Sequence, residues 1–399
     1  MTTAHLPSLD IGTPLDPVAQ PWPLLHQLLA DAPISWIPAL NAYLLVRRAD
    51  VTAALKDKAL SNTGLTQNIQ RLPAEQRDAL QPVYDSVVLW MGHTVPEDHK
   101  RFQNLLKRYF TPRTVNGLRP RIAEITQGLI DRAGGDLEVV SGLAYPLPAS
   151  VIAEMLGMPL EDREQLQLWS RDITALFGGP DFEALSQAQR SVLEMQDYLR
   201  PLLDARRLEP REDLLTVFAA AERDGLVTEA EIVANCVLLL FAGHETTASL
   251  IANGTKLLLD NPGQVALLRA DPSLVPGAVE EMMRMGGPAT FIPRIAAAPV
   301  EIAGQTFPEG TRFFLGLATA NRDPEHYPDP DRFDVTRANA GQQIGFGMGT
   351  YYCLGAALAR AEADECFRIL LTRDVELVSA AVQPIFPLSE GVAALYIRV

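Results

Sequence analysis

The sequence contains few of the features that mark secreted, membrane-bound or nucleic-acid-binding proteins. Its 399 residues include three cysteines, too few for a disulfide framework, which favours a reducing cytosol. The first thirty residues contain five prolines and lack both a basic start and an uninterrupted apolar core. They therefore do not predict a signal peptide or a membrane anchor. The longest apolar run elsewhere, Val237–Gly243, is too short to cross a bilayer.

Positively charged residues are outnumbered by acidic ones. Lys and Arg total 34 against 49 Asp and Glu, which gives a formal net charge of −15. Binding to nucleic-acid phosphates needs an excess of basic side chains, so this balance argues against a nucleic-acid partner. The sequence also contains no internal repeat and no low-complexity linker. We therefore expect one domain over residues 1–399, with an irregular Pro-rich arm over about residues 1–25.

The pattern of apolar residues predicts a mostly α-helical chain with a smaller β part. A β-prone run occupies residues 42–47 (AYLLVR), and helical periodicity dominates from about residue 97 to residue 285. Turn signals interrupt this periodicity at 134–135, 178–180 and 260–263. Prolines and short apolar runs such as 312–317 then predict strands, and a last helix is expected at 354–371.

One long helix, at residues 229–259, is predicted to be apolar around most of its circumference and therefore buried. Its middle, residues 242–247 (AGHETT), interrupts the pattern with a carboxylate, two hydroxyls and a glycine. Burying such polar groups without partners costs several kcal/mol. The Thr246 hydroxyl can bond back to the Ala242 carbonyl, which loosens a helix locally. Two interpretations stay open: a polar helix–helix contact that Gly243 brings close, or an acid and an alcohol that relay protons to a bound group.

A second unusual segment, residues 346–355 (FGMGTYYCLG), immediately precedes a helix-prone run. Its glycines allow a tight turn and a close approach of the backbone to a flat partner. A helix N-terminus favours the thiolate of Cys353, and a thiolate held in this way is a good axial ligand for haem iron. The alternative is a small buried cysteine beside a turn, as we expect for Cys236 and Cys366. No second Cys or His lies at the spacing of a zinc site.

Four segments in order resemble the cytochrome P-450 superfamily. Residues 346–355 resemble its haem-binding loop, and residues 242–247 resemble its oxygen-activation motif. Residues 281–284 (EMMR) are similar to the Glu-x-x-Arg pair on a helix behind the haem, and residues 321–333 resemble the meander that follows. The resemblance implies the cytochrome P-450 fold, with haem between the long central helix and the Cys-bearing loop. It also implies a soluble bacterial haem-thiolate monooxygenase.

The resemblance assigns roles to particular residues. Cys353 is the implied proximal iron ligand, and Glu245 and Thr246 are the implied catalytic residues that deliver protons to dioxygen. The residues implied to contact the cofactor, haem b (iron protoporphyrin IX), are His99, Ala242, Gly243, Arg294, Phe346, Gly347, Tyr351, Cys353 and Gly355. The charge-paired network implied to fix the Cys loop consists of Glu281, Arg284 and Arg332.

Some positions depart from the usual pattern of the superfamily. Tyr351 stands where most members have His, and Gln103 stands where an Arg usually follows the helix His by four residues. Residues 92–96 lack the usual Asp-Pro-Pro. Contacts to the haem propionates are therefore expected from His99, Arg294 and Tyr351.

A basic segment lies within this acidic chain. Residues 99–122 contain seven Lys or Arg residues and no acid. A solvated helix face is one interpretation. In the superfamily, however, the corresponding helix lies beside the proximal haem face, where an acidic ferredoxin docks by charge complementarity. The chain has no flavin or iron–sulfur segment, so electrons are expected from a ferredoxin-type partner and its reductase. The residues expected to dock it are Lys100, Arg101, Lys107, Arg108 and Arg113.

Substrate contacts are expected by position alone. The candidate residues are Leu239, Ala242, Ala289, Thr290, Phe291, Ile292 and Leu388, with the segments 60–95, 178–181 and 386–388. They are largely apolar, which predicts a hydrophobic substrate, although core packing explains any single one equally well. The expected reaction is hydroxylation or epoxidation in natural-product, terpenoid, steroid or fatty-acid metabolism. The enzyme is expected to be a cytoplasmic monomer.

Three other functions remain open at this point. The first is a peroxide-driven or isomerising haem-thiolate enzyme, but Glu245 and Thr246 favour the dioxygen route because peroxide users can do without a proton relay. The second is a non-enzymatic haem-binding or sensor protein. The third is a haem-free helical interaction protein, in which residues 242–247 serve only helix packing.

Overall fold

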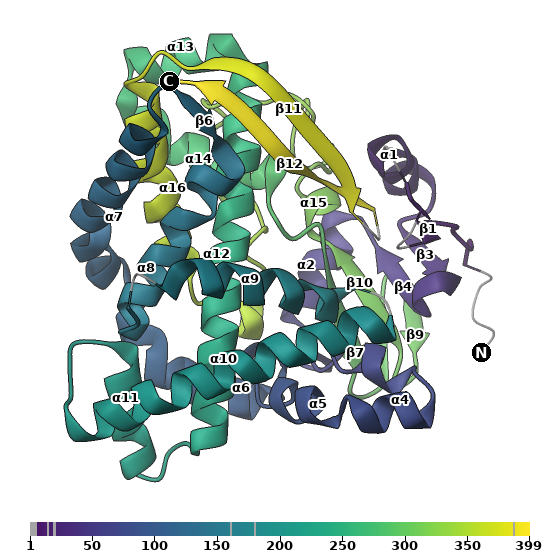
Figure 1. Ribbon diagram of the computed structural model, residues 1–399. Helices are drawn as coiled ribbons and strands as arrows, with labels where there is room; N and C mark the ends of the chain where they lie inside the picture. The colour runs from purple at the N-terminus through teal and green to yellow at the C-terminus, as the bar shows by residue number, and fades with distance from the viewer. Residues whose placement is uncertain (1–5, 14–15, 19–20, 160–161, 179–180, 386–387) are drawn as a thin grey trace. The chain divides into compact units, whose positions relative to one another are not determined.

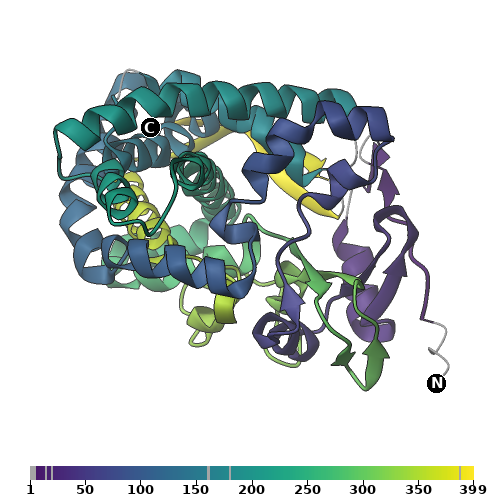
Figure 2. The same ribbon diagram turned by 90° about the horizontal axis from the view of Figure 1, so that it is seen from below.

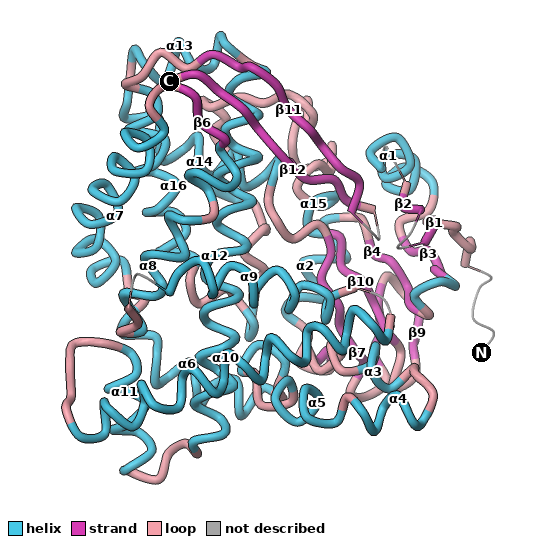
Figure 3. Tube along the Cα trace, viewed as in Figure 1, coloured by secondary structure: helices cyan, strands magenta, loops and turns pink. Residues whose placement is uncertain are grey.

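The computed structural model describes residues 6–13, 16–18, 21–159, 162–178, 181–385 and 388–399. The chain divides into two compact units. The first comprises Met1–Asn62, Phe110–Ala144 and Thr246–Val399, and the second comprises Thr63–Tyr109 and Tyr145–Glu245. Among the described residues, all strands belong to the first unit, whereas the second is built from helices and loops (Figure 3). The expected mostly α-helical chain with a smaller β part is confirmed.

The second unit is organised around its longest complete helix, α10 (Phe182–Leu208). The Asp181 carboxylate caps this helix by accepting from the Ala184 N–H at 3.0 Å. Helix α10 packs against α5, α9 and α11 (Figure 1). The other helices of this unit are α3 (Gln67–Gln70), α4 (Ala74–Ala79), α5 (Gln81–Val87), α6 (Pro96–Leu106), α8 (Pro146–Leu156), α9 (Arg163–Ile173) and α11 (Leu214–Arg223).

The long helix predicted at residues 229–259 is α12 (Glu229–Asp260). It contributes to both units, since the division falls after Glu245. The helix is continuous through Gly243. By length and composition α12 could cross a membrane, but 67% of its most apolar window is buried inside the protein. Burial of this kind is typical of a core helix, as the sequence pattern indicated.

The helices of the first unit are bounded by turn and capping residues. Helix α7 begins after Thr111, whose hydroxyl accepts from the Thr114 N–H at 3.2 Å, and ends at Gly134 with φ of 65°. It packs along α16, the helix that follows the Cys loop. The helices of this unit are α1 (Pro21–Asp31), α2 (Arg48–Lys56), α7 (Pro112–Ala133), α13 (Pro262–Ala270), α14 (Val275–Gly286), α15 (Leu317–Ala320) and α16 (Ala356–Leu371).

The expected irregular arm over residues 1–25 is shorter than predicted. Helix α1 begins at Pro21, and the strands β1 (Gly12–Thr13) and β2 (Asp16–Pro17) form an antiparallel pair before it. Pro21 is the first residue of this helix, a position where the missing N–H of proline costs nothing. The prolines that indicated an irregular arm therefore include one that starts a helix.

The strands of the first unit form two larger sheets. The five-stranded sheet has the order β3-β4-β10-β7-β5, in which β4 and β10 are parallel and the other neighbours are antiparallel. Figure 2 shows its purple N-terminal strands beside its green strands. The three-stranded sheet has the order β11-β12-β6. The strands are β3 (Ile34–Ile37), β4 (Ala42–Leu45), β5 (Leu60–Ser61), β6 (Asp136–Glu138), β7 (Phe291–Ala296), β8 (Val300–Ile302), β9 (Gln305–Phe307), β10 (Arg312–Gly316), β11 (Glu376–Ile385) and β12 (Ser389–Arg398).

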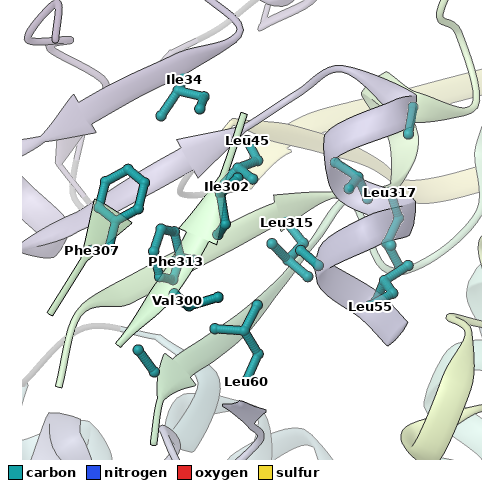
Figure 4. Packing of buried hydrophobic residues seen from close by; sticks show 14 of the residues in the cluster. Ile34, Leu45, Leu55, Leu60, Val300, Ile302, Phe307, Phe313, Leu315 and Leu317 are labelled. Carbon is teal, nitrogen blue, oxygen red and sulfur yellow. The ribbon is translucent and has the colours of Figure 1, made fainter. Parts of the chain in front are cut away.

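A hydrophobic core covers one face of the five-stranded sheet (Figure 4). Phe313 and Leu315 of β10 are fully buried there, and helix α2 contributes Leu55. Phe307 packs edge-on against Phe313, with 5.1 Å between the ring centroids. This core fixes β7 and α2, the two elements that support the Cys loop and its neighbouring arginine.

Candidate active site

The Cys loop is a tight turn closed by backbone hydrogen bonds. The Cys353 N–H donates to the Phe346 carbonyl at 3.0 Å, and the Gly347 N–H donates to the Ile344 carbonyl at 2.8 Å. Gly347 and Gly349 have φ angles of 71° and 70°, which L side chains rarely adopt. A Cβ atom on Gly349 would also lie 2.6 Å from the Leu55 carbonyl oxygen of α2. The turn therefore requires both glycines that the sequence indicated.

Cys353 presents its thiol at the start of a helix, as predicted. The residue is accessible to solvent, but the protein atoms around its sulfur partly desolvate it, and this desolvation raises the pKa of the thiol. The Gly355 N–H and the charge of Arg360 act in the opposite direction and favour the thiolate. Cys236 and Cys366 are buried, as expected for core residues.

Arg294 is a buried cation beside the Cys loop. Its side chain extends from β7, is 3% exposed, and donates to Asn62 Oδ1 at 3.1 Å and to the Pro293 carbonyl at 2.8 Å. Its guanidinium carbon lies 5.2 Å from the centroid of the Tyr351 ring. Burial lowers the pKa of Arg294 to about 10, and none of the described ion pairs supplies it with a carboxylate. A buried guanidinium of this kind suits a carboxylate ligand such as a haem propionate.

The network behind the loop differs from the prediction in one residue. Arg284 and Glu281 of α14 form a fully buried bidentate pair at 2.7 and 2.8 Å. The third member is Arg337, whose Nε donates to Glu281 Oε1 at 3.0 Å. Arg332 was expected there, but its side chain is 64% exposed and faces Asp334 at 3.5 Å. Only its backbone carbonyl joins the network, because the meander turns its side chain outward.

The polar patch of α12, residues 242–247, has one side that is exposed and another that packs against α8. Ala242 and Thr246, one helical turn apart, are both exposed within an otherwise largely buried stretch. Gly243 lies against α8, where an added Cβ would meet Ile152 Cγ1 at 2.9 Å. The close helix approach proposed for Gly243 is thus present in the second unit. It leaves the Ala242 face of the helix open.

Tyr145 is a partner of this patch that sequence reasoning missed. Its hydroxyl donates to Glu245 Oε2 at 2.7 Å. The adjacent His244 is 1% exposed, and its Nε2 lies 3.6 Å from Glu245 Oε1. Tyr145 lies 100 positions before Glu245 in an apolar stretch, so no local pattern connects the two residues.

His99 occupies a buried position on α6 in the second unit. It is 5% exposed, and its Nδ1 lies 2.8 Å from the Met91 carbonyl oxygen. Because a carbonyl only accepts, Nδ1 carries the hydrogen of this bond. The bond fixes the orientation of the ring and directs Nε2 away from Met91. Gln103, one turn later, is partly buried.

The predicted substrate residues fall into different surroundings. Thr290 and Leu388 line one cavity of about 200 Å³ in the first unit, together with Asn253, Met285 and Arg322. Of the other expected contacts, Leu239 is buried, Ala289 and Ile292 pack against the core of the five-stranded sheet, and Phe291 packs in the same cluster as Leu388. The expected positions 179, 180, 386 and 387 lie outside the described residues.

The basic segment is partly neutralised. Arg101 forms an ion pair with Glu231 of α12 and a second one with Asp98 at 3.4 Å. Lys100, Lys107, Arg108 and Arg113 are exposed. Lys107 donates to Asn104 Oδ1, and the Arg108 guanidinium lies over the Tyr109 ring. Of the five expected docking residues, Arg101 is therefore the least available to a partner.

Comparison with known proteins identifies relatives along nearly the whole chain. Residues 269–388 match the family model described as cytochrome P-450. Cytochrome P-450 107B1 of Saccharopolyspora erythraea is 41% identical over 394 residues, covering 96% of this chain and 94% of that protein. The cytochrome P-450 monooxygenase PikC of Streptomyces venezuelae is 38% identical, and the match covers 100% of this chain and 95% of that protein. The crystal structure of myxobacterial cytochrome P-450 CYP267B1 with myristic acid has a TM-score of 0.84 at 38% identity. This match covers 94% of this chain and 95% of that protein.

Proposed function

The chain belongs to the cytochrome P-450 family and is an oxidoreductase of the monooxygenase type, and on this premise we propose which residues carry the reaction. Cys353 is the thiolate ligand of haem b, iron protoporphyrin IX. The observation that carries this assignment is the position of the exposed Cys353, directly before α16 in the turn that its own N–H closes on the Phe346 carbonyl. When bound, the haem supplies dioxygen activation, in which two electrons and two protons convert O2 and a substrate C–H group into an alcohol and water.

The buried arginine supports the same cofactor. Arg294 has no carboxylate partner among the described ion pairs, and a haem propionate supplies one. The Tyr351 ring fixes the guanidinium from one side. We assign Arg294 and Tyr351, with His99, to the propionates, and Phe346, Gly347, Gly355, Ala242 and Gly243 to contacts with the haem itself.

Glu245 and Thr246 are the proposed proton-delivery residues. Glu245 is 17% exposed and Thr246 is exposed, so a proton can reach the alcohol from water through the carboxylate. Retention of both groups supports the dioxygen route over a peroxide-driven one. In this proposal the two residues move protons and take no part in the oxidation itself.

A separate protein supplies the electrons. The chain has no flavin or iron–sulfur segment of its own, so its electrons come from a separate redox partner. We propose a ferredoxin-type partner, reduced by its own reductase, that docks on the exposed Lys100, Lys107, Arg108 and Arg113. Because the exposed charges act through long-range attraction, docking weakens as salt concentration rises.

The substrate is proposed to be a hydrophobic small molecule such as a fatty acid, a terpenoid, a steroid or another natural product. The apolar character of most of the candidate substrate positions, Leu239, Ala242, Ala289, Phe291, Ile292 and Leu388, supports this class. A related structure holds myristic acid, a long-chain fatty acid. The proposed reaction is hydroxylation or epoxidation by a cytoplasmic monomer.

The test is the absorption spectrum of the reduced protein under carbon monoxide, beside Cys353→Ala and Cys366→Ala variants. A strongly red-shifted Soret band that disappears only in Cys353→Ala establishes thiolate ligation. A colourless protein, or a band that does not depend on Cys353, contradicts the assignment. Screening a compound library for a low- to high-spin shift then identifies the substrate class.

A further inference from the structure

A hydrogen bond joins Tyr145 to the carboxylate of Glu245 within the second unit. The Tyr145 hydroxyl lies 2.7 Å from Glu245 Oε2, where Tyr145 directly precedes α8 and Glu245 lies in the middle of α12. The carboxylate is 17% exposed. A hydrogen bond from a hydroxyl to a carboxylate is charge-assisted and therefore stronger than a neutral one.

The direction of this bond is fixed by the surroundings of Tyr145. Burial raises the pKa of the Tyr145 hydroxyl well above its ordinary value, and the nearby charge of Glu245 and the bond to it raise it further. The charge of Arg171 on α9 acts in the opposite direction and is the smaller effect. Tyr145 therefore keeps its proton at neutral pH and acts as the donor, with the Glu245 carboxylate as the acceptor.

His244 faces the other carboxylate oxygen. Its Nδ1 lies 2.6 Å from the Leu240 carbonyl oxygen, and because a carbonyl only accepts, Nδ1 carries the hydrogen. A neutral ring consequently presents Nε2 without a hydrogen to Glu245 Oε1, at 3.6 Å. This distance is too long for a hydrogen bond, and a ring without a hydrogen on Nε2 offers the carboxylate no donor there. The His244 ring also lies 6.0 Å from the Tyr145 ring, so the two residues form one cluster around the carboxylate.

We propose that Tyr145 is a positioning residue for Glu245. We also propose that His244 restricts the movement of the carboxylate by packing beside its second oxygen, Oε1. A glutamate side chain has several rotatable bonds, and a proton relay requires its carboxylate in one orientation toward the next group in the chain of transfer. The Tyr145 hydroxyl selects that orientation without taking part in the transfer. This inference rests on the proposed role of Glu245 in proton delivery.

The first test compares Tyr145→Phe with the wild-type holoenzyme, using a reduced ferredoxin system and a substrate found by spin-shift screening. We expect the fraction of electrons recovered in product to fall about tenfold or more, the value of one hydrogen bond to a charged group. The lost electrons appear as hydrogen peroxide, and the solvent deuterium isotope effect on turnover increases. The substrate dissociation constant and spin shift stay within twofold, because Tyr145 is assigned no contact with substrate.

Tyr198→Phe is the matched control. The Tyr198 hydroxyl of α10 also donates to a carboxylate, that of Asp162, in the same unit. It lies outside the relay, so this variant is expected to keep the wild-type yield of product. Equal losses in Tyr145→Phe and Tyr198→Phe overturn the proposal, since they indicate a general structural effect. Wild-type behaviour of Tyr145→Phe also overturns it.

A second readout does not depend on turnover. Infrared difference spectra against Glu245→Gln identify the carboxylate stretching band of Glu245 in the ferric protein. Loss of the Tyr145 donor is expected to shift this band in Tyr145→Phe and to leave it unchanged in Tyr198→Phe. An unshifted band in Tyr145→Phe contradicts the hydrogen bond itself.

His244→Asn tests the second half of the cluster. The asparagine amide can replace Nδ1 as the donor to the Leu240 carbonyl, but it leaves no nitrogen at the position of Nε2. We expect a smaller loss of product yield than in Tyr145→Phe and a shift of the same infrared band. If the Glu245 band is unshifted in His244→Asn and the product yield equals that of the wild type, His244 has no role in positioning the carboxylate.

Glu245→Gln separates this inference from the proposed function. If this variant keeps full product yield, Glu245 is not the relay and the role of Tyr145 in positioning it is overturned too, whatever the infrared band shows. If Glu245→Gln loses yield and Tyr145→Phe does not, only the inference on Tyr145 is overturned.

Discussion

The guanidinium of Arg360 lies over the ring of Phe346, with 4.3 Å between the Arg360 Cζ atom and the ring centroid. Glu280 on α14 holds the same guanidinium in an ion pair, and the Tyr352 hydroxyl accepts from Arg360 Nη1 at 3.3 Å. Arg360 is therefore fixed beside the Cys loop, and its charge favours the thiolate of Cys353. Arg360 lies outside the sequence motifs at 242–247, 281–284, 321–333 and 346–355.

Substitution of Arg360 by Gln is predicted to change the electronic properties of the haem site. Loss of a positive charge beside the thiolate increases electron donation to the iron, so the reduction potential is expected to become more negative by on the order of tens of millivolts. Dye-coupled spectroelectrochemistry measures this shift. Arg368→Gln on the same helix, where the side chain pairs with Asp364, is the control and is expected to keep the wild-type potential. A common potential in both variants contradicts the prediction.

Substitution of Gly349 by Ala is predicted to destabilise the Cys loop. The residue has a φ of 70°, and the added Cβ would lie 2.6 Å from the Leu55 carbonyl oxygen, a backbone atom that cannot easily move. The free energy of unfolding is expected to fall by about 1–3 kcal/mol, and haem is lost more readily. Denaturant unfolding and haem transfer to an acceptor protein measure the two effects. Gly341→Ala, where nothing lies within 4 Å of the added Cβ, is expected to resemble the wild type.

The two arginines near Glu281 are predicted to differ in their contribution to stability. Arg337 is 8% exposed and donates to the fully buried Glu281, so Arg337→Ala leaves a buried carboxylate with one partner fewer. A loss of about 3–5 kcal/mol in the free energy of unfolding is expected. Arg332 is 64% exposed, and Arg332→Ala is expected to cost below about 1 kcal/mol. Denaturant titrations of both variants decide the assignment, and a reversed order of the two losses restores Arg332 to the network.

Glu362 is predicted to make stability depend on pH. It is 0% exposed, and burial raises its pKa to about 8, with the Thr247 hydroxyl acting in the opposite direction. An unfolded carboxyl loses its proton near 4.5, so the folded protein binds more protons between about 4.5 and 8. The contribution of Glu362 to the free energy of unfolding is therefore full below this window and falls as pH rises through it.

Glu362→Gln removes this titration. The free energy of unfolding of the variant minus that of the wild type is expected to increase by up to a few kcal/mol as the pH rises from 5 to 8. Denaturant unfolding at a series of pH values measures the difference between the two proteins. The exposed Glu301→Gln is the control and is expected to follow the wild-type slope. A constant difference between Glu362→Gln and wild type across this range rejects a protonated Glu362.

Local patterns predicted the helices well because their signals lie within a few residues. The apolar periodicity of residues 229–259 gave α12 within one residue of its end, and the Gly134 signal marked the end of α7. The start of α1 at Pro21 was missed, since proline is compatible with both an irregular arm and the first turn of a helix. The sheet order could not be predicted, because β4 and β10 pair across more than 260 residues of chain.

Within the site, the residues identified from the sequence are those embedded in short motifs. Cys353 and its glycines, and the pair of Glu281 and Arg284, depend on neighbours in the chain and could be identified there. Arg337, Arg360 and Tyr145 could not be, since their partners Glu281, Glu280 and Glu245 lie 56, 80 and 100 positions away.

Sequence patterns alone were enough to identify the class of this protein: a mostly helical chain with a cysteine loop, an acid and an alcohol on a buried helix, and a glutamate–arginine pair. Turn geometry, helix periodicity and the spacing of chemical groups are local, so they can be read from neighbouring residues. The side chains that pair with or donate to these groups could be identified only in the folded chain. Arg337 replaces Arg332 behind the Cys loop, and Tyr145 binds Glu245, because burial and long-range packing determine which donor reaches a given carboxylate.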